Sequence, residues 1–204
     1  MTFISRRDLL KRTVGVAAAI PLTRVLQVAR ERPQILAAAE FETLDAMVAR
    51  LIPSDDLGPG AKEAGASIYI DRALGGALAS SRQAYAAGLA ALDRYAQSSR
   101  GASFARLSPV DQDSVLIDVE TGAATGFSGS SAAFFTMVLN HTHQGTFGDP
   151  FYGGNANFAG WDLIGYPGVR TMVSAADQKQ LEAGALRANH KSAYDYDAFN
   201  KAQK

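Results

Sequence analysis

The sequence predicts a mainly α-helical protein: a single compact helical domain with a long glycine- and aromatic-rich loop, preceded by an N-terminal signal segment. Three observations support this fold class. Apolar residues recur at helical spacing through most of the chain after residue 40. Helix start and stop signals flank several of these stretches. The 204 residues, 47% hydrophobic and 20% charged, suffice for one globular domain with a sizeable core. We therefore divide the chain into residues 1–39, a signal segment and linker, and residues 40–204, the helical domain.

The N-terminal segment has the order of a bacterial export signal. Residues 5–11 read Ser-Arg-Arg-Asp-Leu-Leu-Lys and precede a weakly apolar stretch over residues 13–22. The pair Arg6 and Arg7 resembles the twin-arginine signal, which directs folded proteins across the bacterial inner membrane. The run Ala37–Ala39 fits the small-residue rule for cleavage, and an uncleaved signal that serves as an anchor is the alternative. We expect a protein of the periplasm, free or on the periplasmic face of the inner membrane.

Three helices are expected in the first half of the domain. One covers residues 41–51 and is stopped by Pro53, because proline cannot continue a helix. A second runs from about residue 68 to about residue 78, and a third covers residues 85–96. The apolar residues that define the faces of the first and third helices are Phe41, Leu44, Val48 and Leu51, and Tyr85, Leu89, Leu92 and Ala96.

Three more helices are expected further along the chain. Ser108 and Pro109 followed by Asp111 are typical of a helix start, with a capping hydroxyl, a proline in the first turn and an acidic residue near the positive helix end. Residues 132–139 are almost wholly apolar and predict a buried helix, although period alone leaves a buried strand open. A last helix is expected to open at Ser174 and to end near Gly184 or Arg187.

Residues 145–168 differ from the rest in composition. Seven of these 24 positions are glycine, two are proline and six are aromatic. We expect a loop without its own secondary structure, which is uncommon at this length unless the loop has a function. Such a segment packs either on its own core or on a partner, and composition leaves both open.

Motifs for independent chemistry are missing. The absence of cysteine excludes disulfides, cysteine nucleophiles and thiolate metal sites. The stretch Gly58-Pro59-Gly60 lacks the third glycine and the preceding strand of a dinucleotide-binding loop. A net charge of zero argues against nucleic acid as a partner. Basic residues instead concentrate at the N-terminus: residues 1–39 hold seven Lys or Arg and two Asp or Glu.

The remaining polar candidates are weak. On a helix, His141 and His143 point about 200° apart and cannot easily share a metal ion; on a strand they would share a face, with Asp149 as a neighbouring acid. The adjacent Asp55 and Asp56 are typical of a solvated turn. The sequence therefore predicts no catalytic residue, no cofactor-binding residue and no metal ligand in this chain.

A series of motifs resembles the gluconate 2-dehydrogenase subunit 3 family over about residues 40–170. Its most specific part is the Asp-Pro-x-Tyr-Gly-Gly-Asn stretch of residues 149–155 with the following Gly160-Trp161. The other matching stretches are Ile52-Pro53-Ser54-Asp55-Asp56, Gly58-Pro59-Gly60-Ala61, Tyr69-Ile70-Asp71-Arg72, Tyr85-Ala86-Ala87-Gly88-Leu89, Phe104-Ala105-Arg106-Leu107-Ser108, Gly145-Thr146-Phe147-Gly148 and Ile164-Gly165-Tyr166-Pro167-Gly168.

The resemblance implies a small subunit without its own catalytic site. It implies a large FAD-dependent partner of the glucose–methanol–choline type, which oxidises a sugar, polyol or glycoside, and a cytochrome c with haem in some complexes. It also implies that the small subunit escorts the folded, flavin-loaded partner through the twin-arginine export machinery. Some relatives are linked to the large subunit by a disulfide; this chain lacks cysteine, so we expect a noncovalent heterodimer.

We expect residues 145–168 to contact the large subunit, with Trp161 as one anchor, because interfaces concentrate energy in a few buried aromatic side chains. Two alternatives stay open. The subunit lends residues to the active site of its partner, with His141, His143, Asp149 or Asn155 as candidates, or it is an independent exported sugar-binding protein in which Trp161 stacks on a sugar ring. The expected interface residues are Phe147, Asp149, Pro150, Tyr152, Gly153, Gly154, Asn155, Trp161, Tyr166 and Pro167.

Overall fold

A computed structural model of the chain describes residues 33–200. These residues belong to one unit, which spans residues 31–204. The predicted signal, with Arg6 and Arg7, lies outside the described residues. Residues 33–39, which the sequence analysis grouped with the signal and linker, are part of the same unit as the helical domain.

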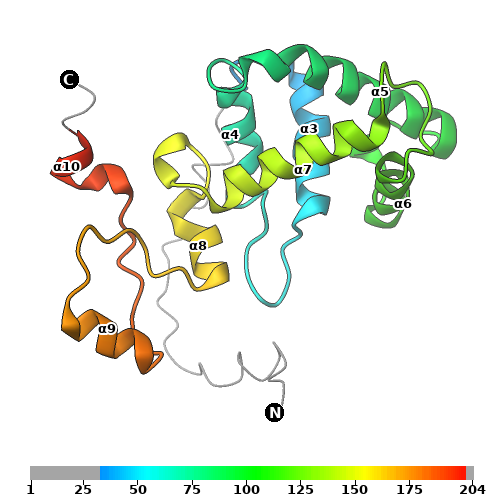
Figure 1. Cartoon of the computed structure of the whole chain (residues 1–204). Helices are drawn as coiled ribbons and strands as arrows, with labels where there is room; N and C mark the ends of the chain where they lie inside the picture. The colour runs from blue at the N-terminus through cyan, green and yellow to red at the C-terminus, as the bar shows by residue number, and fades with distance from the viewer. Residues whose placement is uncertain (1–32, 201–204) are drawn as a thin grey trace. The chain divides into compact units, whose positions relative to one another are not determined.

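The described part of the chain is mainly α-helical, as predicted, and contains no strand beyond an isolated bridge between Asp55 and Gly58. Figure 1 shows α7 crossing α3. The α-helices are α3 (Ala38–Leu51), α4 (Ala66–Ala73), α5 (Arg82–Arg100), α6 (Pro109–Glu120), α7 (Ser131–Phe147), α8 (Ala159–Ile164), α9 (Ala175–Glu182) and α10 (Asp197–Asn200). Short 3-10 turns are η1 (Ala79–Ser81), η2 (Phe104–Arg106), η3 (Pro150–Tyr152), η4 (Ala156–Phe158) and η5 (Ala193–Asp195).

Most helix boundaries follow the expected local chemistry. Helix α3 ends at Leu51, two residues before Pro53. The Ser108 hydroxyl accepts a hydrogen bond from the Asp111 amide at 3.2 Å and caps α6. Ser174 caps α9 in the same way. The second helix was expected to reach residue 78, but α4 ends at Ala73, because the chain turns through two glycines that follow it.

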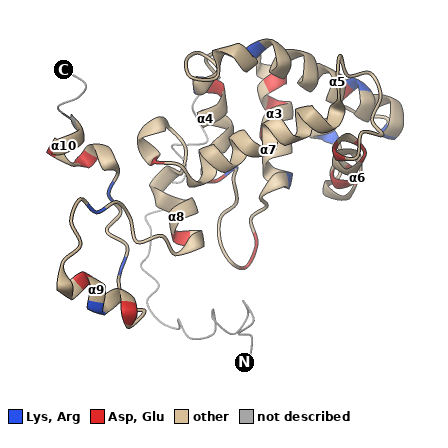
Figure 2. Cartoon of the chain, viewed as in Figure 1, with Lys and Arg blue, Asp and Glu red and all other residues tan. Residues whose placement is uncertain are grey.

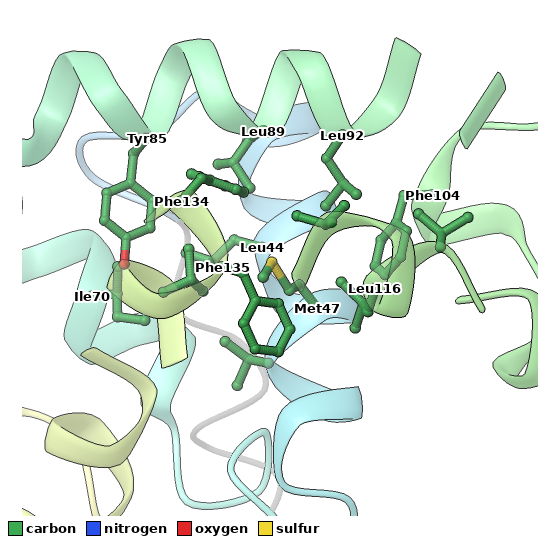
Figure 3. Packing of buried hydrophobic residues seen from close by; sticks show 14 of the residues in the cluster. Leu44, Met47, Ile70, Tyr85, Leu89, Leu92, Phe104, Leu116, Phe134 and Phe135 are labelled. Carbon is green, nitrogen blue, oxygen red and sulfur yellow. The ribbon is translucent and has the colours of Figure 1, made fainter. Parts of the chain in front are cut away.

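The apolar faces of the five helices α3 to α7 meet in one core, which Phe104 of η2 completes (Figure 3). Residues 132–139, for which the sequence left a helix or a strand open, lie in α7 and are helical. Their side chains Phe134, Phe135 and Val138 are buried. The fully buried side chains that contribute most volume are Tyr85, Phe104, Leu44, Met47, Ile70, Leu74, Leu89, Leu92, Val48, Val115, Val119 and Val138.

Glycine allows α7 to approach its neighbours closely. A Cβ on Gly145 would lie 2.8 Å from the Cα of Ala66 on α4, closer than real Cβ atoms approach backbone. A Cβ on Gly88 of α5 would overlap the ring of Phe134. The helix pairs α4–α7 and α5–α7 therefore depend on these two small residues.

Charged side chains tie the first helices together at the edge of this core. Arg50 of α3 forms a two-pronged ion pair with Asp113 of α6, both contacts at 2.7 Å. Asp93 of α5 accepts hydrogen bonds from Thr43 of α3 and from the backbone of Phe104. Figure 2 shows that α7, in contrast, carries no charged residue.

The expectation that residues 145–168 form a loop without secondary structure is wrong. Residues 145–147 complete α7, and the remainder contains η3, η4 and α8, joined by short irregular stretches. Several glycines in this segment permit close contacts with the backbone of α7.

Candidate partner-binding surface

Asn155 organises the segment that follows α7. Its backbone amide donates to the Gly145 carbonyl at 2.6 Å, and its side-chain Nδ2 donates to the Gly148 carbonyl at 2.9 Å. Its Oδ1 accepts from the amide of Gly160 at 2.8 Å, at the start of α8. The residue is fully buried and has φ of 45°, in the left-handed region that asparagine tolerates better than most residues. One side chain thus joins the end of α7 to α8.

Two glycines bring this segment onto the backbone of α7. A Cβ on Gly154 would overlap the carbonyl oxygen of Gly145, and a Cβ on Gly160 would overlap that of Thr146. The amide of Ala156 also donates to the Ala64 carbonyl at 2.9 Å. The segment is therefore fixed at several points and is not a free loop.

Trp161 is an internal residue. Its side chain is 5% exposed, and its Nε1 donates to the Phe147 carbonyl at 2.8 Å. The rings of Phe158 and Tyr166 cover it, with centroids 5.4 and 4.8 Å away. The role of Trp161 as an interface anchor stays a prediction, and within this chain the indole packs on its own neighbours. A sugar ring finds no open indole face.

Asp149 connects the segment to the C-terminal tail. Its Oδ1 accepts from the Phe151 amide at 2.9 Å and its Oδ2 from the Ala193 amide at 2.8 Å. Phe151 stacks on Tyr194 with centroids 3.7 Å apart, and the hydroxyl of Tyr152 lies 2.7 Å from that of Tyr194. Phe151 and Tyr152 remain 48% and 55% exposed. These two rings are held rigidly while half of each faces outward.

The expected interface residues thus divide by exposure. All ten stay predicted interface residues; the exposed ones are open to direct contact with a partner, and the buried ones are enclosed by contacts within the chain. Exposed are Tyr152 and Tyr166; half-buried are Phe147, Asp149, Pro150, Gly153 and Pro167; buried are Gly154, Asn155 and Trp161.

Charge is nearly absent from residues 121–168, as the sequence alone shows. Only Asp149 and Asp162 are charged among these 48 residues. The Asp149 carboxylate accepts hydrogen bonds from the amides of Phe151 and Ala193. Asp162 pairs with His190 at 2.7 Å. Interface cores are depleted in charged residues. The residues of α7 that face outward or lie half-exposed on this side are Ala133, Thr136, Met137, Asn140, His143 and Gln144.

A cavity of about 250 Å³ opens beside this outward side of α7. Gly88 of α5, Phe127 of the preceding loop and Ala133, Phe134 and Met137 of α7 line it. Its walls carry no charged side chain. The cavity lies beside the N-terminal half of α7, whereas residues 151–166 follow the C-terminal end of that helix.

Backbone strain is concentrated in the same segment. Asn155, Asn157 and Phe158 all have φ between 45° and 63°. Phenylalanine is a poor occupant of the left-handed region, and such strain persists only where surrounding contacts impose it. The Phe158 ring is held between Trp161 and His190, with centroids 5.4 and 5.1 Å away. The segment has a defined conformation before any partner binds.

His141 and His143 lie in different surroundings on α7. His141 stacks on Tyr85, and its Nδ1 lies 3.0 Å from the Tyr85 hydroxyl, while His143 is exposed. Burial lowers the pKa of His141 and raises the pKa of Tyr85. Within residues 33–200 no group of three His, Asp or Glu side chains is placed to hold a metal ion. In the same range no helix is long and apolar enough to cross a membrane.

The fold of the described residues and the family comparison together define the class: a mainly helical accessory subunit of a dehydrogenase complex. The family model described as Gluconate 2-dehydrogenase subunit 3 matches residues 38–168, and the chain belongs to that family. Searches of curated proteins and of solved structures gave no significant match. The match ends at Gly168, so α9 and the tail lie outside it.

Proposed function

We propose that this chain is a non-catalytic small subunit that binds and stabilises an FAD-dependent dehydrogenase of the glucose–methanol–choline type. The partner carries the FAD and oxidises a sugar, polyol or glycoside; in those complexes of the family that include a third subunit, a cytochrome c accepts the electrons. Family membership supports the accessory role. The partner type and its cofactors follow from the resemblance of the motifs in residues 52–168.

The observation that carries the binding role is the rigid, charge-poor surface formed by residues 121–168. Removing water from a charged surface is costly, whereas the uncharged side chains and half-exposed rings here cost little to cover. The segment is already ordered by Asn155 and by its glycines, which reduces the entropy lost on binding. A large flavoprotein surface is the occupant we propose for this region.

The export role rests on Arg6 and Arg7. The twin-arginine pathway moves folded proteins, and flavin is inserted in the cytoplasm, so a signal on the small subunit can serve both chains. Changing both arginines to lysine should trap both subunits in the cytoplasm, because the planar guanidinium groups are not replaced by ammonium groups. The distribution of the large subunit is measured by the flavin content and the dehydrogenase activity of the periplasmic and cytoplasmic fractions. Normal arrival of the large subunit in the periplasm with the double lysine variant would refute the escort role.

The binding role is tested by co-purification. A tag on this chain should retain a large subunit that shows a flavin absorption spectrum, while the chain purified alone should be colourless and should oxidise no sugar with an artificial acceptor. Flavin bound to the isolated chain would contradict the proposal.

A further inference from the structure

Residues 34–36 are held by one buried carboxylate. Asp71 of α4 is 2% exposed. Its Oδ2 accepts from the Gln34 amide at 2.6 Å, and its Oδ1 accepts from the amides of Ile35 and Leu36 at 3.2 and 2.8 Å. Three consecutive backbone amides therefore donate to a single side chain of α4. That side chain is more than 30 positions further along the chain.

The next residues continue this attachment. The amide of Ala37 donates to Glu40 Oε2 at 2.8 Å, and the amide of Phe41 donates to the Ala37 carbonyl at 2.9 Å. Leu36 is buried in the core, and a Cβ on Gly75 would lie 2.9 Å from Ile35 Cδ1. Ala38 and Ala39 already belong to α3. Main-chain and side-chain contacts thus fix the chain from Gln34 into the helix.

This arrangement conflicts with cleavage at Ala37–Ala39, the small-residue run that the sequence offers as a processing site. A peptidase binds its substrate as an extended strand with free backbone groups. Here the run forms the first turn of a helix, and the residues before it are bonded to Asp71. Cleavage would require this region to open, and its rate would follow the population of the open form.

We propose that Asp71 and residues 34–36 form a latch that fixes the start of the domain and protects Ala37–Ala39 from processing. The mature domain then retains residues 34–39 at its start. The proposal rests on the export role only where processing in the cell is concerned. The latch itself belongs to the folded chain and is testable without export.

The test uses the purified full-length chain and elastase, which cleaves after small residues. Exposed residues 183–185 follow the end of α9 and provide an internal reference for cleavage. In the wild-type chain, cuts after residues 37–39 should be much slower than cuts at 183–185. Asp71→Asn should raise cleavage after residues 37–39 at least about tenfold, because the amide cannot accept all three hydrogen bonds. The rate at 183–185 should not change.

Asp45→Asn is the matched control. Asp45 lies on α3, accepts from Ser67 and pairs with Lys62, and makes no contact with residues 34–36. It should leave the cleavage pattern as in the wild type. Should Asp71→Asn fail to fold, amide hydrogen exchange of the wild-type chain decides: the amides of residues 34–37 should be protected. Free exchange there, or equal elastase rates at both places in the wild type, would overturn the latch.

In cells, the mass of the N-terminal peptide of the exported protein shows at which residue the mature chain begins. The latch predicts a mature N-terminus at or before Gln34. A wild-type N-terminus at Glu40 would overturn the latch and leave the accessory role intact. Absence of export would refute the escort role, and the elastase experiment would still judge the latch.

Discussion

Residues 38–120 and residues 121–168 contribute to the same fold but differ in how they use charge. The first region has 19 charged residues among 83, and the second has two among 48. The first uses ion pairs and carboxylates to join helices, as in Arg50–Asp113. The second uses glycine contacts, the amide of Asn155 and the indole of Trp161. A region with so few charged residues of its own can be covered by a partner at lower electrostatic cost than the first region.

Within residues 121–168, burial distinguishes residues that stabilise the fold from residues that are open to contact with a partner. Asn155 and Trp161 are buried and hold the segment in place, whereas Phe151 and Tyr152 are half exposed. Substitutions of the scaffold should therefore change stability, and substitutions of the outward surface should change binding. The predictions below test that separation, from the largest expected effect to the smallest.

Replacing Trp161 by alanine should have the largest effect on stability. The change removes a buried indole and leaves the Phe147 carbonyl without its donor. We expect the free energy of unfolding of the isolated chain to fall by about 3–5 kcal/mol, the range for buried Trp or Phe to Ala substitutions. Urea titration measures it. An unchanged unfolding midpoint, with weaker binding to the partner, would show that Trp161 acts at the interface instead.

Asn155→Gly should cost less, about 2–3 kcal/mol, because it leaves a half-buried carbonyl and a buried amide without the Asn155 side chain as partner. Glycine accepts the positive φ of this position without strain, so the change isolates the side-chain hydrogen bonds.

Asn157→Gly is the matched control for this substitution. Asn157 also has positive φ, at 55°, but is exposed. Its replacement should change the free energy of unfolding by less than about 1 kcal/mol. Equal losses for the two variants would show that the hydrogen bonds of Asn155 are not what stabilises the segment.

The smallest expected effect concerns pH. Burial lowers the pKa of His141 below its reference value of 6.5, so the unfolded chain binds this proton more readily than the folded chain. The stabilising contribution is therefore present above pH 6.5 and is lost as the pH falls below it. His141→Gln should reduce the loss of stability between about pH 7.5 and about pH 5.5.

Unfolding titrations at several pH values measure this effect. His143→Gln is the control, since it removes an exposed histidine from the same helix and leaves the His141 ring in place. A wild-type pH dependence that persists in full in His141→Gln would exclude His141 as its source.

Much of the helical fold could be predicted because its signals are local. Apolar spacing located α3 and α5, and the hydroxyl caps of Ser108 and Ser174 located the starts of α6 and α9. The fold of residues 148–168 could not be predicted in this way. It depends on contacts of Asn155 and Gly160 with the end of α7, and no local pattern reports such contacts.

The candidate surface was predicted only in part. Aromatic content drew attention to residues 145–168, but it could not distinguish a buried ring such as Trp161 from an exposed one such as Tyr152. The low charge of residues 121–168 is a sequence property and could have extended the predicted surface to α7. The latch at Asp71 could not be found, because it joins backbone amides to a side chain distant in sequence.

The central claim is that the charge-poor region binds the large subunit. The most direct measurement compares the dissociation constants of two chains that each receive one carboxylate on an exposed helical alanine. Ala133 lies on α7 beside the cavity, and Ala90 lies on α5 in the charged region. Ala133→Glu should weaken binding to the FAD-dependent subunit at least about 100-fold, or about 3 kcal/mol, because the charge is buried without a partner. Ala90→Glu should change the dissociation constant by less than about threefold. Wild-type affinity for Ala133→Glu, with both variants folded, would contradict the account.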